Sequence, residues 1–255
     1  MLNRGGGSVG QTTVTMLHPD MASHFRSEHF KSKQFAAYGV IQRALQGAKR
    51  PLIAFSGGKD SLAVLALVHA VDPTVPLLWS DDELEYPETV EYLKTVRELA
   101  GDHMIVTLGH ALHANWFRPW RNKPFHRDPL PGALHIGTYV ERWQAAQGYD
   151  LVFTGLRAGE SRARRRNAMF RGDTYDTATG MRCTPVMDWT ADDVWAMIAG
   201  LGLPYNRVYD ILHQIGVARE GQRVGPLPLS PRHLLAAGWP YLLEWLEQRY
   251  GPRWE

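Results

Sequence analysis

Two hydrophobic patterns alternate along the chain and predict alternating strands and helices. Runs of consecutive apolar residues are typical of buried strands, whereas apolar residues three or four positions apart are typical of one helix face. The predicted strands cover 52–55, 75–80, 103–108, 149–155 and 183–189. The predicted helices cover 60–71, 87–100, 133–148 and 191–202, preceded by one helix or a helix pair within 20–49. Residues 109–132 are predicted to be a loop, and the chain beyond 203 to be helical.

This alternation determines the expected fold class. Strands that alternate with helices form βαβ units, which build a parallel sheet covered on both faces. We therefore expect an α/β fold with a doubly wound, mostly parallel five-stranded sheet and helical N- and C-terminal additions. Residues 1–20 are expected to be flexible, 21–205 to form the α/β domain and 206–255 to form a helical C-terminal extension. Ligands of such sheets bind beyond the carboxyl ends of the strands, so the residues that follow strands are the candidates for a site.

The segment after the first predicted strand has the composition of an anion-binding loop. It reads Ser56-Gly57-Gly58-Lys59-Asp60-Ser61 and leads directly into an apolar helix. The first N–H groups of a helix are unpaired and lie at the positive end of its dipole, and glycines let an oxyanion approach the backbone. The serine hydroxyls and the lysine charge add further donors. A glycine turn that only caps the helix is the alternative, and the spacing differs from the GxxxxGK[ST] phosphate loop.

Three acidic residues follow the second predicted strand. Asp81, Asp82 and Glu83 would lie beside a ligand at the glycine loop, because parallel strands end at the same edge of the sheet. Their carboxylates can hold Mg²⁺ or contact the ribose or adenine. A solvated acidic loop that caps the next helix is an equally simple interpretation.

Arginines follow the fourth predicted strand. Gly155 allows a close turn, and Arg157 and Arg164 can form forked hydrogen bonds with phosphate or sulfate oxygens. Glu160 can orient one of these arginines. Contact of the basic run Arg162–Arg166 with an RNA or DNA backbone is the rival interpretation, and a plain solvated loop is a third.

These segments, in this order, resemble a known family. Residues 56–61 are similar to the SGGxDS loop of the PP-loop ATP pyrophosphatases, which hold the β,γ-pyrophosphate and break ATP between the α- and β-phosphates. Residues 80–89 resemble the "IDTG..FPET" region of the PAPS reductase family, although Asp82 and Glu83 replace Thr and Gly. Residues 154–164 resemble its "GxRxxESxxR" element, and 184–206 its "PL.DWT..DVW.YI....LPYN" region. The resemblance runs from about residue 50 to 225 and implies an adenine nucleotide alpha hydrolase-like fold.

The resemblance also implies roles for individual residues. Lys59 and Arg157 would offset the charge that grows on the α-phosphate and the leaving pyrophosphate, and Asp60 would act through the loop or the metal. Mg²⁺ is expected with ATP, and its protein ligands are undefined. The residues expected to bind ATP are Ser56, Gly57, Gly58, Lys59, Asp60, Ser61, Asp81, Gly155, Arg157, Glu160 and Arg164.

Cys183 is the one cysteine among the 255 residues and restricts the redox chemistry. One thiol cannot form a C-x-x-C pair or a four-cysteine iron–sulfur site. Gln222 and Gly225 stand where iron–sulfur members of the family carry cysteines, and the sequence closes on RYGPRWE where the other reductase class has a Cys-Gly-containing tail. We therefore expect no iron–sulfur cluster, and a PAPS or APS reductase would have only Cys183 as its nucleophile.

The leading functional prediction is an enzyme that cleaves ATP to AMP and pyrophosphate, with water or an unknown acceptor taking the AMP. The alternatives are a sulfonucleotide reductase and a nucleotide-gated accessory protein of a mobile element or of a CRISPR or antiviral defence system. The net charge of +2 does not by itself call for a nucleic acid, so such a partner, or a ribonucleoprotein, would bind locally at 162–166. A homodimer is left open. The lack of a long apolar segment and of cysteine pairs favours a cytoplasmic protein without a membrane span.

Overall fold

The computed structural model describes residues 17, 19–81, 84–108, 136–227 and 230–250. The expected flexible segment 1–20 lies mostly outside the described residues, as do Asp82 and Glu83. The predicted loop 109–132 lies outside them entirely. Every helix within the described ranges is too short or too polar to cross a lipid bilayer.

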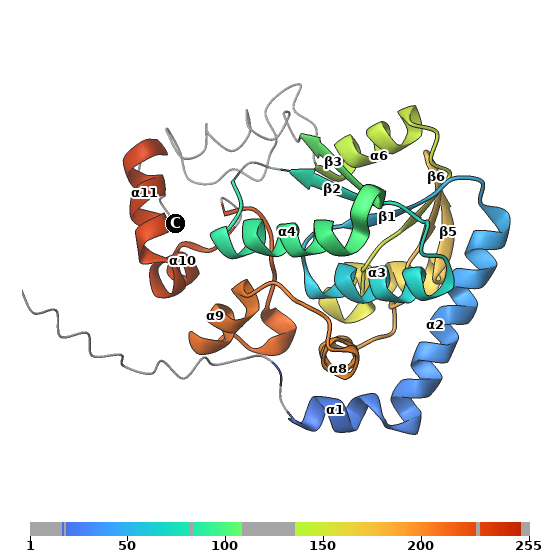
Figure 1. Cartoon of the computed structure of the whole chain (residues 1–255), viewed down its shortest axis with the longest axis horizontal. Coiled ribbons are helices and arrows are strands. Elements are labelled where there is room, and N and C mark those ends of the chain that lie inside the picture. Colours follow the sequence, from blue (N-terminus) through green and yellow to red (C-terminus); the bar gives the residue numbers. More distant parts are fainter. Residues whose placement is uncertain (1–16, 18, 82–83, 109–135, 228–229, 251–255) are drawn as a thin grey trace, which may run out of the picture.

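A six-stranded sheet forms the centre of the molecule (Figure 1). Its strand order is β3-β2-β1-β4-β6-β5, and all neighbours are parallel except β5 and β6. The order confirms the doubly wound, mostly parallel α/β sheet, with one strand more than expected. The strands are β1 (Pro51–Phe55), β2 (Leu77–Asp81), β3 (Met104–Leu108), β4 (Leu151–Phe153), β5 (Thr174–Thr177) and β6 (Gly180–Cys183).

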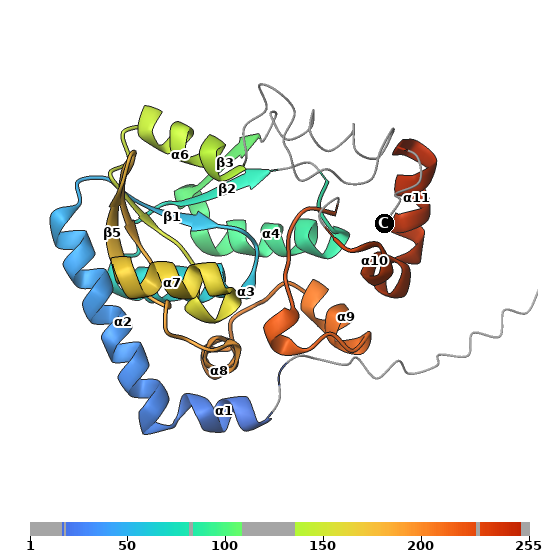
Figure 2. The same ribbon diagram turned by 180° about the vertical axis from the view of Figure 1, so that it is seen from behind.

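Helices cover both faces of this sheet (Figures 1 and 2). On one face, the larger core cluster joins apolar side chains of α2, α3, α4 and α8 to the sheet, and on the other, Trp143 of α6 packs against Leu52, Leu78 and Val152. The helices are α1 (Pro19–Phe25), α2 (Glu28–Gly47), α3 (Lys59–Val71), α4 (Pro87–Ala100), α6 (Ile136–Ala146), α7 (Arg162–Arg171), α8 (Ala191–Leu201), α9 (Val208–Gln214), α10 (Arg232–Gly238) and α11 (Pro240–Tyr250). Short 3₁₀ turns are η1 (Gly101–His103), η2 (Ala158–Glu160) and η3 (Arg219–Gly221).

The predicted strand at 183–189 is wrong, because β6 ends at Cys183. Beyond it the chain turns, with Met187 N donating to Thr184 O at 3.1 Å. The sequence analysis also missed the β5–β6 hairpin, whose turn ends at Gly180 with a φ of 129°. These two strands read TYDT and GMRC, so neither presents the apolar run that predicts a buried strand. They lie at the outer end of the sheet, where partial exposure tolerates polar residues.

Strand order reverses between β1 and β4, and Gly155 lies at this junction. The chain passes from β1 outward through β2 to β3, whereas β4 pairs with the other side of β1. Beyond β4, a Cβ on Gly155 would lie 2.6 Å from the carbonyl carbon of Asp60 and 2.7 Å from the amide nitrogen of Ser61. The segment after β4 can therefore contact the start of α3 because residue 155 has no side chain.

We predict that Gly155→Ala destabilises the fold and displaces the segment around Asp60. The atoms in the way are backbone, so α3 or the segment after β4 must shift, and overpacking of this kind costs about 1 to 3 kcal/mol. Gly159→Ala is the matched control, because a Cβ there would meet its nearest neighbour, Arg157 Nη1, only at 3.9 Å. Urea unfolding of both variants and the parent measures the effect. Equal stability of Gly155→Ala and Gly159→Ala would show that the close approach is unimportant.

Candidate functional site

The edge of the sheet at which strand order reverses collects most of the residues predicted to bind a ligand. The loop Ser56–Ser61 connects β1 to α3, and the segment Gly155–Glu160 follows β4, the strand paired with β1. Asp81 is the last residue of β2, on the other side of β1. These segments lie at the carboxyl ends of three neighbouring parallel strands, which is where doubly wound sheets bind ligands.

The loop Ser56–Ser61 is closed by its own serines. Ser61 is buried, and its hydroxyl donates to Gly58 O at 2.9 Å and accepts from Ser56 N at 3.2 Å. Its oxygen also lies 3.2 Å from the hydroxyl of Ser56, which is exposed. Gly57 adopts a left-handed φ of 71°, and a Cβ there would lie 3.2 Å from the Trp79 ring. Ser61 thus maintains the turn, and Ser56 is the serine open to a ligand.

The first turn of α3 supplies the backbone donors of the site. Gly58 is the N-cap and has no side chain with which to satisfy the helix amides. Lys59 N donates instead to the buried Tyr209 hydroxyl at 2.9 Å, which fixes the loop against α9. Helix starts of this kind bind anions through their free N–H groups and the positive end of the dipole.

The ammonium group of Lys59 lies inside the protein beneath the loop. Its side chain has no exposed surface, and Nζ lies 3.0 Å from Asp60 Oδ2, 3.5 Å from Gln222 O and 5.5 Å from the centre of the Tyr209 ring. Burial lowers the pKa of Lys59, and the neighbouring carboxylate of Asp60 opposes this effect. Because the ammonium group is covered, Lys59 would attract an anionic ligand by its electrostatic potential and not by a direct hydrogen bond.

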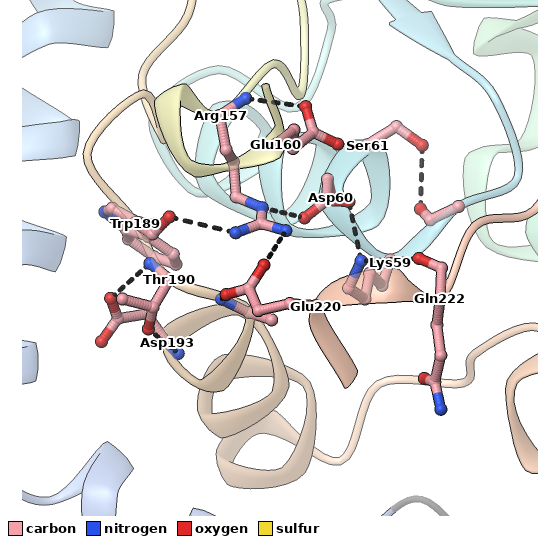
Figure 3. A network of polar contacts seen from close by, with 12 residues as sticks. Lys59, Asp60, Ser61, Arg157, Glu160, Trp189, Thr190, Asp193, Glu220 and Gln222 are labelled. Carbon is pink, nitrogen blue, oxygen red and sulfur yellow. Dashed lines mark hydrogen bonds and ion pairs between the residues drawn. The ribbon is translucent and has the colours of Figure 1, made fainter. Parts of the chain in front are cut away.

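Arg157 is fully buried and is held by groups from three parts of the chain (Figure 3). Its Nε donates to Asp60 Oδ1 at 2.6 Å, its Nη1 to Trp189 O at 3.2 Å and its Nη2 to Glu220 Oε2 at 3.3 Å. Since Lys59 occupies the other oxygen of Asp60, this carboxylate is shared by two buried cations. The structure brings Lys59, Asp60 and Arg157 together, and the guanidinium of Arg157 faces protein groups.

Glu160 organises a second group of charges beside the first. Its carboxylate accepts from Arg157 N at 3.1 Å and forms an ion pair with Arg164 of α7. Arg223 Nε lies 3.6 Å from the other carboxylate oxygen of Glu160. Burial and the charge of Arg223 both lower the pKa of Arg164. The sequence prediction that Glu160 orients an arginine therefore agrees with the geometry, with two arginines in place of one.

Sequence reasoning missed Tyr209, Glu220 and Arg223 as parts of the site. Glu220 links Arg157 to the start of α8, because its other oxygen accepts from Ala191 N at 2.8 Å. Burial raises the pKa of Glu220, but this hydrogen bond and the charge of Arg157 lower it more, so the net shift is downward. These residues lie far along the chain from the loop, in segments without a polar motif of their own, so no local pattern indicated them.

The remaining candidates lie apart from this network. Arg162, Arg165 and Arg166 are exposed on α7, and their predicted contact with a nucleic acid stays a prediction. Cys183 is buried at the end of β6, where Thr174 Oγ1 donates to its sulfur at 3.6 Å. Burial raises the pKa of this thiol to about 12. Within the described ranges, no three His, Cys, Asp or Glu side chains come together as a metal site.

The chain is similar in sequence and in fold to several known proteins. A protein of Methanocaldococcus jannaschii with no characterised function is 27% identical over 188 residues, which cover 68% of this chain and 36% of that protein. Sulfate adenylyltransferase subunit 2 of Rhizobium meliloti is 21% identical over 232 residues, covering 80% and 76% of the two chains. The crystal structure of PAPS reductase from Candida auris superposes with a TM-score of 0.60 at 16% identity, over 85% of this chain and 99% of that one.

The family assignment rests on a match to a family pattern that covers more than half of the chain. The sequence pattern of the phosphoadenosine phosphosulfate reductase domain matches residues 50–216, from β1 to the end of α9. This range contains the loop Ser56–Ser61, the segment Gly155–Arg164 and the start of α8. It stops before Glu220 and Arg223. The chain therefore belongs to the phosphoadenosine phosphosulfate reductase domain family.

Proposed function

We propose that this protein binds ATP at the loop Ser56–Ser61 and cleaves it between the α- and β-phosphates, releasing pyrophosphate. The observation that carries the proposal is the start of α3, which lies behind a Gly-Gly turn with two buried cations next to it. Attack at the α-phosphorus with departure of pyrophosphate needs little covalent chemistry from the protein and depends on positioning and positive charge. The relationship to a sulfate adenylyltransferase subunit supports the choice of the α,β bond.

The geometry divides the work among the loop residues. Ser56 is exposed, so its hydroxyl is placed to contact phosphate oxygens. Gly57 and Gly58 are buried, and they keep side chains out of the turn behind which α3 begins. Lys59 would stabilise the charge on the leaving pyrophosphate from below the loop. Arg157 would act as a positioning residue, since its guanidinium holds Asp60 and through it the first turn of α3.

Mg²⁺ would enter this site bound to the phosphates of ATP. Mg²⁺ in such sites is usually held by substrate phosphates together with one or two carboxylates. Both oxygens of Asp60 are already engaged by Lys59 and Arg157, which leaves this carboxylate a poor ligand. Asp81, which ends β2 at the same edge of the sheet, would be the protein carboxylate that holds the ion. Mg²⁺ would supply positive charge for the leaving group.

The products of ATP cleavage show which bond is broken and so test the proposal. Incubation of the protein with ATP and Mg²⁺ should yield AMP and pyrophosphate in equal amounts, as measured by ³¹P NMR. Gly58→Val should abolish product formation, because its branched side chain would occupy the helix start and meet Tyr209 and Ser56, the nearest atoms to a Cβ at this position. ADP and phosphate as the products would contradict the α,β assignment. Tight ATP binding without any AMP would favour the nucleotide-gated accessory protein.

A sulfonucleotide reductase is the second candidate, because the family and the PAPS reductase structure agree with it equally well. It would require a thiolate nucleophile, and Cys183 is both buried and poorly acidic. We expect the parent protein to release no sulfite from PAPS or APS in the presence of thioredoxin. We also expect Cys183→Ser to form AMP from ATP at a rate within a few-fold of the parent. Sulfite release that disappears in Cys183→Ser would establish the reductase instead.

Arg157→Ala tests the positioning role of this residue. Removing one partner of a buried ion pair costs about 3 to 5 kcal/mol, because the other charge is left uncompensated. We expect a loss of this size in the free energy of unfolding, together with loss of AMP formation. The double variant Asp60→Asn/Arg157→Gln should recover part of the stability but not the activity. Arg165→Ala, on the exposed side of α7, is the control and should change stability by less than about 0.5 kcal/mol.

A further inference from the structure

Helix α7 is sparsely packed on the rest of the fold. It follows η2, packs closely against that turn, and lies on the near side of the molecule in Figure 2. Its sequence reads RARRRNAMFR and contains no acidic residue. Within the part of the chain that the structure describes, neither hydrophobic core cluster includes a side chain of α7. The interior of the fold therefore does not account for the sequence of this helix.

One face of α7 combines arginines with large apolar side chains, and we call it the outer face. Its residues follow the spacing i, i+3, i+4, i+7 and i+8, which places them on one side of a helix. They are Arg162, Arg165, Arg166, Met169 and Phe170. All five are exposed, Met169 at 80% and Phe170 at 82%. Three positive charges and two large apolar groups are thus presented to solvent together.

The arginines of the outer face repel one another. Arg162 lies three and four positions before Arg165 and Arg166, where like charges destabilise a helix. The first turn of α7 has no acidic residue, so its cations also lie unfavourably beside the positive end of the helix dipole. Because these charges oppose the formation of the helix, folding alone does not explain them, and such conflicts mark functional positions.

The arginines on the other side of α7 have partners within the protein. Arg171 lies over the ring of Tyr175 in β5, with its guanidinium carbon 5.3 Å from the ring centre, and Arg164 forms an ion pair with Glu160. By contrast, none of the three arginines of the outer face forms an ion pair with another residue that the structure describes. The uncompensated charge is therefore concentrated on the outer face.

We propose that the outer face of α7 binds single-stranded nucleic acid, with its arginines on the phosphates and Phe170 stacked on a base. This surface is separate from the proposed ATP site, and the inference does not depend on ATP cleavage. A strand carries a negative charge at every nucleotide, so one strand can neutralise several neighbouring arginines. An exposed aromatic ring beside these arginines gives an unpaired base a surface on which to stack, and Met169 extends that apolar surface.

The composition of the outer face favours a single strand over other partners. A helix that lies on a lipid surface carries its cations and its apolar residues on different faces, whereas α7 has both on one face. An acidic protein would have to bring several carboxylates to one short helix, whereas a nucleic-acid strand has a phosphate at every nucleotide. A duplex offers phosphates but keeps the faces of its bases stacked, which leaves Met169 and Phe170 without a contact.

The test measures fluorescence anisotropy of a short labelled single-stranded DNA of mixed sequence, without ATP, at several salt concentrations. Arg162→Gln, Arg165→Gln and Arg166→Gln should each weaken binding. The slope of log affinity against log salt concentration should become shallower by about 0.7 for each arginine removed. Phe170→Ala should weaken binding of this strand about fivefold or more, through the loss of base stacking. A strand of the same length without bases should bind equally well to Phe170→Ala and to the parent.

Two residues away from the outer face serve as matched controls. Arg171 belongs to the same helix but lies over Tyr175, and Phe35 of α2 is 80% exposed, close to the value of Phe170. Neither Arg171→Gln nor Phe35→Ala should change the affinity for the strand by more than about twofold. Each arginine variant of the outer face removes like-charge repulsion, so its thermal midpoint should equal or exceed that of the parent. This measurement separates lost binding from lost folding.

Several results would overturn the inference. A parent protein without salt-dependent affinity for the strand would remove the nucleic-acid partner. Equal losses in Arg171→Gln and Arg165→Gln would reduce the effect to net charge, and unchanged binding of the normal strand by Phe170→Ala would remove the stacking contact. Tighter binding of the matching duplex would contradict the preference for a single strand. Tighter binding of vesicles with anionic lipids, or of polyglutamate, would assign the outer face to a membrane or to an acidic protein.

Discussion

The ion pair between Arg157 and Asp60 is the interaction on which the arrangement of the site depends. It joins the segment after β4 to the first turn of α3, at the place where strand order reverses. A buried guanidinium is strongly destabilising without partners, and the partners of Arg157 come from the loop after β1, from Trp189 before α8 and from η3. Four segments separated along the chain are thus held in one geometry by the need to satisfy one side chain.

Much of this arrangement follows from local sequence patterns. The apolar runs at 52–55 and 75–80 and the helix signals after them are strong because parallel strands are buried on both faces. Gly57, Gly58 and Gly155 stand out because each occupies a position that a side chain would strain or block. Thr190 caps α8 in the same local way: its hydroxyl accepts from Asp193 N, and the Asp193 carboxylate accepts from Thr190 N in return.

The parts that sequence patterns could not supply depend on distant pairing. Tyr209 contacts Lys59 across 150 positions, and Glu220 contacts Arg157 across 63. A single tyrosine or glutamate in a helix or turn has the same local appearance whether it faces solvent or another segment. The edge strand β5 and its neighbour β6, which lies between β5 and β4, escaped detection for a related reason. Their place in the sheet comes from pairing with β4 and from a turn at Gly180, and their residues are of mixed polarity. Gln222 stands where iron–sulfur members of the family carry a cysteine, so its sequence suggests only a lost motif. In the structure its backbone oxygen accepts from Lys59 Nζ, and the neighbouring Glu220 pairs with Arg157.

The burial of the Cys183 thiol makes its reactivity dependent on motions of the β5–β6 hairpin. Cys183 is the last residue of β6, and its buried thiol accepts a hydrogen bond from Thr174 of the opposite strand of the β5–β6 hairpin. Alkylating reagents need both access and thiolate, and the folded state supplies neither. The rate at which Cys183 is alkylated in the native protein therefore reports how often this edge of the sheet opens, a local fluctuation that is distinct from global unfolding. The only sulfhydryl group in the sequence is in this way an intrinsic probe of hairpin opening.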